Sequence, residues 1–571
     1  MRSPSDSIAP RRRLRASSGA LLLAAALAAG SLVACVGNLG DPPSGSEPVA
    51  APVQVVAARF PRLSHAQWEQ TVVDLFHLDA PTGLSASFTP DPLGGKAFDN
   101  NQSALEVSPS LWSDYERAAE SIAASVTGDA AKLARILPPN LTAAPETNAM
   151  AFIMAFGQRA YRRPLRFDER NAQRALFASG ATLYPDLDPF VAGVRLSITA
   201  FLQSPHFIYR AEMDAQSPLV GVALAPLGSW AIASRLSYAL WNSMPDDELF
   251  RAAASGELAV PAGLRAQIER LLGSPRAGAT VTRFFDQLYG GNQYTSLTKS
   301  KALYPDFDPS VGAEMRAELG KFTGDVFQRG GGVRELLTST TTFVTPRLAA
   351  IYGISKAPSG APDADGFSRV ELDPSQRAGL LTRSGFLAWK GTDSESNIIQ
   401  RGVFVTRKII CQKLGAPPAA AQGATVGGQK TNRARINALT GPGTCGESCH
   451  GTYINAPGFA LEHYGAMGEY RTLDGDSPID AAATFPFTDG SMAFTDAVDF
   501  SQVLAKSPQV HACFSGFLLE YIAGRERVPA DDPFVADLAR RSLSGASARD
   551  LLVSVLMSDV VRYPLAITEI Q

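Results

Sequence analysis

The sequence lacks an excess of either charge. It contains 52 lysine and arginine residues against 55 aspartate and glutamate residues, a formal net charge of −3 over 571 residues. A protein that binds nucleic acid through its surface carries a basic excess or a basic patch. The charge balance therefore argues against a nucleic-acid partner, and the hydrophobic content of 45% predicts a globular protein.

Long hydrophobic runs are absent except near the N-terminus. Residues Ala20 to Ala34 form an apolar run of 15, shorter than the roughly 20 residues that a membrane-spanning helix needs. Arginines precede this run at positions 11, 12, 13 and 15, so we predict that residues 1–34 are a secretion signal. The run ends in "LVAC", which resembles the lipobox of bacterial lipoproteins and predicts a lipid on Cys35.

A lipid on Cys35 would hold the protein to a membrane through its N-terminus. Residues 35–58 are rich in Gly, Pro and Ser and predict a flexible tether. Val36 stands where an aspartate is associated with inner-membrane retention, which favours the outer membrane or its periplasmic face within the cell envelope. The alternative is an ordinary signal peptide followed by a chance cysteine.

Alternating strand patterns are scarce, and helical periodicity dominates. Ile232, Leu236 and Leu240 share one helical face, and Phe514, Leu518 and Ile522 share another. We predict a mainly α fold with several domains. Amphipathic helices are expected within Ser108–Leu137, Thr147–Tyr161, Leu187–Phe207, Gly312–Gln328, Asp373–Trp389 and Ile399–Leu414, and a short strand within Thr338–Thr345.

Familiar catalytic motifs are missing. The sequence has no nucleophile elbow, zinc-protease motif, Walker loop or dinucleotide fingerprint. The acidic "MPDDE" (Met244–Glu248) could supply a carboxylate pair to a glycosidase, but proline followed by acids is also a typical helix start. We therefore predict no catalytic residue and keep a polysaccharide hydrolase as a third possibility.

The chain has five cysteines, two of which lie in "GTCGESCHG" (Gly443–Gly451). Attachment of haem c requires C-x-x-C-H, and here one additional residue separates Cys445 from Cys449. A looser turn, helped by Gly446, could absorb that residue. Cys445 and Cys449 are then the predicted thioether residues and His450 the iron ligand, with Met492 as the predicted second axial ligand.

Two other interpretations of this segment stay open. Without Cys35, four cysteines remain, and if haem takes two, Cys411 and Cys513 are left as a plausible disulfide. Four cysteines fit two disulfides equally well, with three possible connectivities. Zinc could instead use Cys445, Cys449, His450 and His463, although adjacent ligands at 449 and 450 are awkward on one small ion.

Further motifs follow one another in a recognisable order. They are "RLSHAQWEQTVVDLF" (Arg62–Phe76), "AFDNNQSALEVSPSLWSDYERAAESIA" (Ala97–Ala123), "FGQRAYRRPLRFDE" (Phe156–Glu169), "LSYALWNSMPDDELFRAAASGEL" (Leu236–Leu258), "RAGLLTRSGFLA" (Arg377–Ala388) and "APGFALEHYGAMGEYR" (Ala456–Arg471). From about Arg62 to Tyr563 the chain resembles large secreted proteins of planctomycetes and myxobacteria, built from domains of unknown function 1587, 1595, 1592, 1588 and 1585.

The resemblance implies a helical body followed by a smaller helical, cytochrome-c-like C-terminal module. The expected divisions are helical domains at 59–140, 145–215 and 224–354, a linker at 355–372, a Cys-x3-Cys-His domain at 373–470 and a helical domain at 471–571. The chain departs from the family pattern in the additional residue before Cys449, in "NAPGF", and in His463 and Gly465. The resemblance also implies an exported protein as a partner.

These observations predict an exported, lipid-anchored protein that transfers electrons at the cell envelope through haem c, with a redox partner. The alternative is a non-enzymatic surface or periplasmic binding scaffold stabilised by disulfides.

Overall fold

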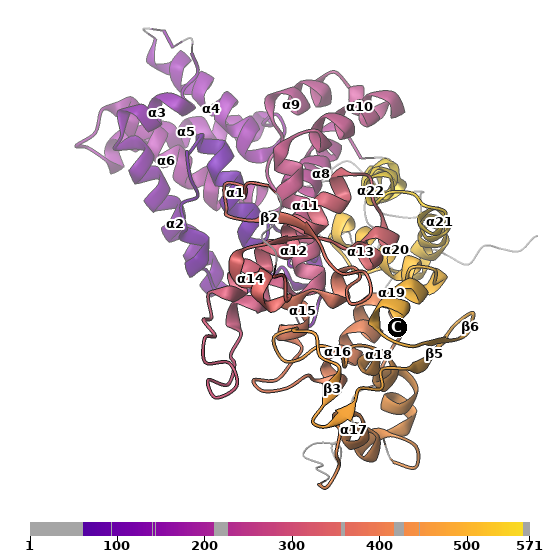
Figure 1. Ribbon diagram of the computed structural model, residues 1–571. Helices are drawn as coiled ribbons and strands as arrows, with labels where there is room; N and C mark the ends of the chain where they lie inside the picture. Colours follow the sequence, from indigo (N-terminus) through magenta and orange to yellow (C-terminus); the bar gives the residue numbers. More distant parts are fainter. Residues whose placement is uncertain are drawn as a thin grey trace, which may run out of the picture. The chain divides into compact units, whose positions relative to one another are not determined.

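The computed structural model describes residues 61–92, 94–139, 141–142, 144–210, 227–355, 360–415, 427–444 and 446–563. The predicted signal, Cys35 with its predicted lipid and the predicted tether lie outside these residues, and so does Cys445. The described residues belong to one compact unit, Gln54–Gln571. Helices make up most of it and its strands are few and short, which confirms the mainly α prediction (Figure 1).

The first part of the chain is helical. Its elements are α1 (His65–Phe76), η1 (Leu84–Ser87), η2 (Gln102–Ala104), α2 (Pro109–Thr127), α3 (Ala130–Ile136), α4 (Pro145–Tyr161), α5 (Phe167–Leu183), α6 (Pro189–Gln203) and α7 (Pro205–Ile208). Their apolar faces form one hydrophobic core, in which Trp68, Phe152 and Phe201 are buried.

The middle part continues the helical pattern and adds one strand pair. Its elements are α8 (Ser229–Trp241), α9 (Asp247–Ala254), η3 (Glu257–Ala259), α10 (Pro261–Leu272), α11 (Pro275–Tyr289), η4 (Gly291–Ser296), α12 (Val311–Gln328), α13 (Val333–Thr338), β1 (Thr341–Val344), α14 (Pro346–Ile351) and β2 (Ser368–Glu371). Strand β1 lies within the predicted strand region and pairs antiparallel with β2, with Thr341 opposite Glu371.

The last part mixes helices with two hairpins. Its elements are η5 (Leu380–Thr382), α15 (Ser384–Trp389), α16 (Ile398–Phe404), η6 (Val405–Ile409), α17 (Asn432–Thr440), η8 (Glu447–Ile454), α18 (Asn455–Ala460), β3 (Leu473–Asp474), β4 (Ser477–Pro478), β5 (Ala483–Phe487), β6 (Gly490–Phe494), α19 (Ala497–Leu504), α20 (Pro508–Ala523), η9 (Pro529–Asp531), α21 (Asp532–Leu543), α22 (Ala548–Met557) and α23 (Asp559–Arg562). Segments η6 and η8 are π-helices.

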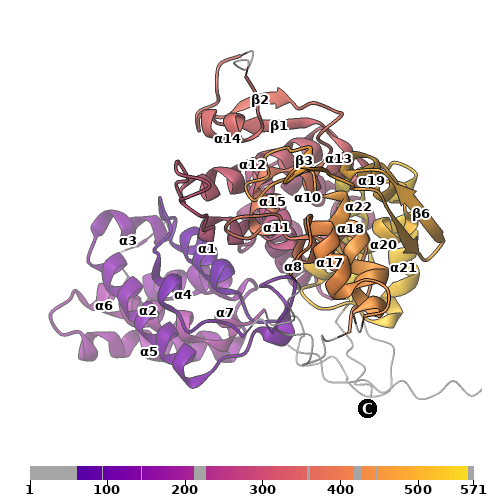
Figure 2. The same ribbon diagram turned by 60° about the horizontal axis from the view of Figure 1, so that its bottom comes forward.

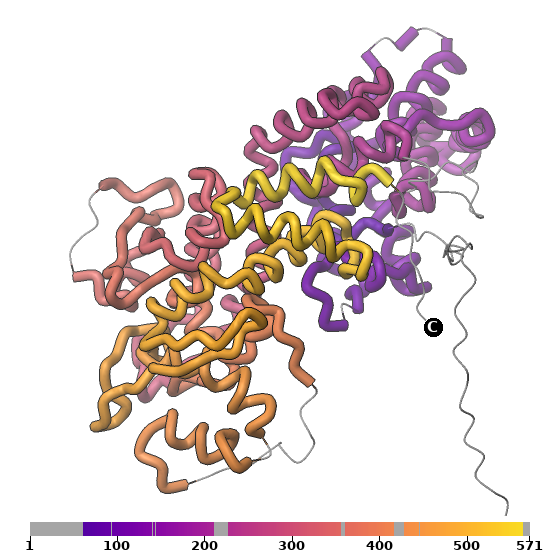
Figure 3. The backbone as a smooth tube through the Cα atoms, turned by 90° about the vertical axis from the view of Figure 1, so that its right-hand side faces the viewer, coloured from indigo at the N-terminus to yellow at the C-terminus, as the bar shows by residue number. Residues whose placement is uncertain are grey.

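The second hydrophobic core joins the middle and last parts. The Phe284 ring on α11 lies 5.2 Å from the Tyr521 ring and 6.1 Å from the Phe514 ring, both on α20. Helix α22 contacts α10 as well as α20. In Figure 3 these yellow C-terminal helices lie beside the magenta helices of the middle part, because residues far apart in sequence share this core.

Local sequence explains where the helices begin. The Ser64 hydroxyl accepts a hydrogen bond from the Gln67 amide at 3.3 Å, and the Gln67 side chain accepts one from the Ser64 amide at 3.1 Å. This reciprocal capping satisfies two amides that the first helical turn leaves without partners. Helices α2, α4 and α6 begin with proline, whose fixed φ suits a first helical position.

Two helix predictions are wrong in extent. The stretch Asp373–Trp389 contains only η5 and α15, because the chain turns at Gly379, which has a φ of +55°. The stretch Ile399–Leu414 is helical only as far as η6. Cys411, which we expected on this helix, lies beyond its end with a φ of +57°. Within the described parts of the chain, no helix is long and apolar enough to cross a membrane.

Candidate functional site

The Cys-His segment lies on the π-helix η8. At its end the Asn455 amide donates to the His450 carbonyl, five residues earlier, whereas at its start the His450 amide donates to the Gly446 carbonyl, four residues earlier, at 2.7 Å. A π-helix closes its hydrogen bonds from i to i+5, one residue further than an α-helix, and such segments occur frequently at functional sites. The turn that follows His450 is therefore wider than an α-helical turn, whereas the turn that leads into Cys449 and His450 is closed by a bond of the α-helical type.

Gly446 supports this turn for a different reason than predicted. Its φ of −85° is open to any residue, so it contributes no conformational freedom that alanine lacks. A Cβ atom at position 446 would instead lie 3.1 Å from Thr440 Cα and 3.2 Å from Thr440 Cβ. The residue is small because η8 approaches the end of α17 closely.

Three side chains hold η8 against its neighbours. The buried Asn455 side chain, 2% exposed, donates to the Thr440 hydroxyl at 3.0 Å and so joins the two ends of residues 441–454. The Gly443 amide donates to the Glu447 carboxylate at 2.8 Å, and the Thr406 hydroxyl on η6 donates to the Tyr453 carbonyl at 2.7 Å. These bonds fix the backbone on both sides of Cys449 and His450.

Cys449 is a half-buried free thiol. The Ser448 hydroxyl lies 3.9 Å from its sulfur, a weak contact. Free cysteines usually behave as small buried hydrophobes, whereas reactive ones are partly exposed. The thiol of Cys449 is therefore accessible for a covalent bond.

His450 follows with a half-buried imidazole. Its Nδ1 atom is buried and has no hydrogen-bond partner among the residues that the structure describes. Partial burial lowers the pKa of His450 below its ordinary value, because desolvation disfavours the imidazolium. A neutral imidazole with an unsatisfied nitrogen is the form that binds a metal ion or donates to an added group.

Met492, the predicted second axial ligand, has an accessible side chain. Met467 is only 6% exposed and packs in the core, whereas Met492 on β6 is 48% exposed. Met492 lies directly opposite Phe485 in the β5–β6 register, so both side chains occupy one face of the hairpin. The Phe485 ring lies 6.2 Å from the Tyr453 ring, which places that face of the hairpin against η8.

The zinc interpretation finds no support in the described part of the site. His463 Nδ1 lies 2.9 Å from the Arg471 carbonyl oxygen, and its ring stacks on Tyr470 with centroids 5.4 Å apart. Outside the undescribed residues, which include Cys445, no three His, Cys, Asp or Glu side chains group as metal ligands.

The predicted disulfide between Cys411 and Cys513 is present, with the two Cα atoms 5.4 Å apart. Cys411 follows η6 and is exposed, whereas Cys513 lies on α20 and is 3% exposed. The bond therefore links the segment before the Cys-His turn to a helix of the second core.

A buried polar network beside the site gave no clear signal in the sequence. The Arg401 guanidinium is fully buried and donates to the carbonyls of Leu387, Leu461, Tyr464 and Gly465 at 2.7 to 3.0 Å. Burial raises the pKa of Glu462, which accepts from the Ser396 hydroxyl at 2.6 Å. The signal available was a charged residue inside an apolar stretch, as in "GFALEHYG".

The acidic cluster is structural. The Asp246 carboxylate caps α9 by accepting from the Leu249 amide at 2.9 Å and pairs with Arg270 at 2.7 Å. Glu248 pairs with Arg251 on the same helix. The structure thus supports the helix-start interpretation, because the Asp246 carboxylate caps the helix and the carboxylates of Asp246 and Glu248 both form ion pairs.

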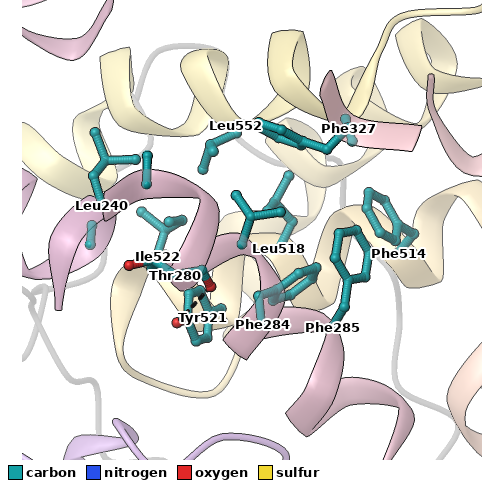
Figure 4. A pocket seen from close by; sticks show the side chains of 14 residues that line it. Leu240, Thr280, Phe284, Phe285, Phe327, Phe514, Leu518, Tyr521, Ile522 and Leu552 are labelled. Atoms are coloured by element: carbon teal, nitrogen blue, oxygen red, sulfur yellow. Dashed lines mark hydrogen bonds between the residues drawn. The ribbon is translucent and has the colours of Figure 1, made fainter. Parts of the chain in front are cut away.

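One apolar cavity lies where α11, α20 and α22 meet. Its volume is about 20 Å³, and Phe284, Phe514 and Leu552 are among the side chains that line it (Figure 4). Pockets for drug-sized ligands measure roughly 300 to 1,000 Å³. This cavity cannot hold a porphyrin, and neither Cys449 nor His450 lines it.

Fold and site together define a class: a mainly helical protein with one inter-segment disulfide and a Cys-His turn on a π-helix. Five family models match the chain in order, each described as a protein of unknown function: DUF1587 (61–128), DUF1595 (148–212), DUF1592 (227–354), DUF1588 (377–474) and DUF1585 (490–561). The chain belongs to the family of proteins that combine these five domains.

The Cys-His turn falls within the DUF1588 match, whose model bears the name PSCyt3. Neither a curated protein nor a solved structure matches the chain.

Proposed function

We propose that this protein carries haem c, which Cys445 and Cys449 would hold by thioether bonds and His450 by a bond to the iron, and that it transfers electrons at the cell envelope. One observation carries the proposal. A free, half-buried thiol is followed at once by an imidazole whose buried nitrogen has no partner among the described residues, both on a π-helical turn. When bound, haem supplies reversible one-electron chemistry at its iron.

The residues of this chain have distinct tasks in that proposal. Cys449 supplies a thioether sulfur, and neutral His450 supplies a nitrogen lone pair. Met492 on the neighbouring hairpin face would offer an accessible thioether as a further ligand to the iron. Asn455 and Thr406 hold the backbone of η8, so that the order of thiol and imidazole along the turn is kept.

The cellular setting is part of the same proposal. A secretion signal at residues 1–34 and a lipid on Cys35 would bring the chain to the outer membrane or periplasmic face, where haem c is attached. The disulfide between Cys411 and Cys513 suits such an oxidising compartment. An exported protein with a redox centre is the proposed partner.

A disulfide-stabilised binding scaffold is the second candidate. It is favoured by the Cys411–Cys513 bond, which ties the Cys-His domain to α20 with no cofactor. In its simplest form this candidate pairs Cys445 with Cys449, and the free thiol of Cys449 argues against that second bond.

The test is covalent haem. We would express the protein in a host with haem-maturation machinery and record the visible spectrum and the intact mass under denaturing conditions. A Soret band and a mass excess of one porphyrin are expected for the wild-type protein. The double variant Cys445→Ser/Cys449→Ser should lose the covalent link, whereas Cys411→Ser, the matched control, should keep it. A colourless wild-type protein without mass excess would refute the proposal and favour the scaffold.

A further inference from the structure

Strand β6 has an outer edge that no other described segment covers. The β5–β6 sheet has two strands, and in Figures 1 and 2 no third strand lies beside β6. Ser491, Met492 and Ala493 are all exposed. Outside the hairpin, neither Ser491 nor Ala493 makes a backbone hydrogen bond to any described residue.

Pro486 shows which backbone groups point outward. Residues opposite one another in an antiparallel pair alternate between hydrogen-bonded and non-hydrogen-bonded positions. Pro486 lies opposite Ser491 and has no N–H, so this pair is a non-hydrogen-bonded one, and Thr484 opposite Ala493 is the next. Ser491 and Ala493 therefore direct their N–H and C=O groups away from β5.

The two edges of this hairpin are protected unequally. Proteins prevent unwanted strand pairing with proline or charge on an edge. The edge of β5 contains Pro486, which removes an outward donor. The edge of β6, "GSMAF", contains neither proline nor a charged residue. Only the β6 edge is open for pairing.

We propose that β6 pairs antiparallel with β6 of a second copy of this chain, which extends the hairpin into a four-stranded sheet. A two-fold axis at Met492 places Ser491 of one protomer opposite Ala493 of the other, and the reverse. Each such pair exchanges two backbone hydrogen bonds, because both residues direct their donors and acceptors outward.

The choice of a second copy rests on self-complementarity. In an isologous pair the residue at the axis faces its own copy, so a charged residue there would meet the same charge. Met492 occupies the axis and is uncharged. Asp489, the nearest charge before the strand, would lie opposite Thr495 of the partner, so no like charges meet. The pairing uses the backbone of Ser491 and Ala493, and the two Met492 side chains lie beside one another at the axis.

The experiment is sedimentation velocity of the purified protein from low micromolar to millimolar concentration. The wild-type protein should change from monomer to dimer as concentration rises. Ala493→Pro removes only an outward N–H, as Pro486 does on β5, and should stay monomeric, whereas the matched variant Ala493→Ser should dimerise like wild type. Circular dichroism and the intact Cys411–Cys513 bond verify that the proline variant is folded.

A second variant and a second readout protect the conclusion against a folding defect. Ser491→Pro should also abolish dimerisation. In the wild-type protein the amide hydrogens of Ser491 and Ala493 should exchange more slowly in the dimer than in the monomer at low concentration. A wild-type protein that is monomeric at every concentration would overturn the proposal and leave this edge to a different protein. Dimerisation that persists in both proline variants would overturn it as well.

Discussion

Removal of the Cys411–Cys513 disulfide should lower the stability of this protein by several kilocalories per mole. The bond closes a loop with a sequence separation of 102 residues. Because a cross-link restricts the unfolded chain, the entropy that it removes grows with the logarithm of loop length. For a loop of about 100 residues at 25 °C the chain-entropy relation gives about 4.7 kcal/mol.

Cys411→Ser is the cleanest way to test this value. Cys411 is exposed, so the serine adds little cost of its own, and the buried Cys513 keeps its packing. Guanidinium denaturation should show a lower midpoint for this variant than for wild type, by an amount equivalent to about 4 to 5 kcal/mol. Reductant should lower the wild-type midpoint to the same value and leave the Cys411→Ser midpoint unchanged.

Cys449→Ser is the matched control in protein without haem. It removes a thiol rather than a cross-link, and its denaturation midpoint should stay at the wild-type value. If Cys411→Ser shifted the midpoint by less than about 1 kcal/mol, the chain-entropy reasoning would be wrong here. The unfolded chain would then retain enough structure between residues 411 and 513 to make the cross-link redundant.

Three further outcomes follow from buried polar groups. Burial lowers the pKa of His511, whose ring nitrogens contact Ser542 and a carbonyl, so the unfolded state binds a proton first as pH falls. The contribution of His511 to stability should be complete above the ordinary histidine pKa and decline as the pH falls below it. Melting temperatures measured over roughly pH 5 to 8 should therefore decline less steeply in His511→Gln than in the wild-type protein. Burial raises the pKa of Glu318, which accepts from two hydroxyls at 2.6 Å; Glu318→Gln should cost less than about 1 kcal/mol in denaturation and Glu318→Ala about 2 to 5 kcal/mol. Asn455→Ala removes the side-chain amide that donates to the Thr440 hydroxyl and should lower the free energy of unfolding by about 1 to 3 kcal/mol. The amides of Glu447–Ile454 should also exchange faster in this variant. Unchanged exchange there would show that Asn455 does not hold the turn.

Helices with strong periodicity could be predicted closely from the sequence. The expected stretch Gly312–Gln328 is α12 at Val311–Gln328, and Thr147–Tyr161 is α4 at Pro145–Tyr161. Helical periodicity, capping residues and proline at the first position act over a few residues, so a single chain shows them. The acidic start of α9 was predictable for the same reason.

The β5–β6 hairpin could not be predicted in this way. Pro486 argues against a strand, and only pairing with β6 shows that the proline faces an outer edge. The π-helix at Glu447–Ile454 was also beyond the sequence, although the additional residue before Cys449 pointed to an unusual turn. Its geometry depends on Thr406, which contacts Tyr453 from η6, and on the bond from Asn455 to Thr440, which joins the two ends of residues 441–454.

The sequence by itself determined the helical class, the family and the residue types at the Cys-His segment, because periodicity and motif spacing are local properties of the chain. Tertiary structure decided which cysteines join. Counting left three connectivities open, and only the packing of α20 beside η6 brings Cys411 and Cys513 to a Cα separation of 5.4 Å. Tertiary structure likewise decided that Cys449 keeps a free thiol and that the Nδ1 of His450 is buried, since both depend on segments that meet only when the chain is folded.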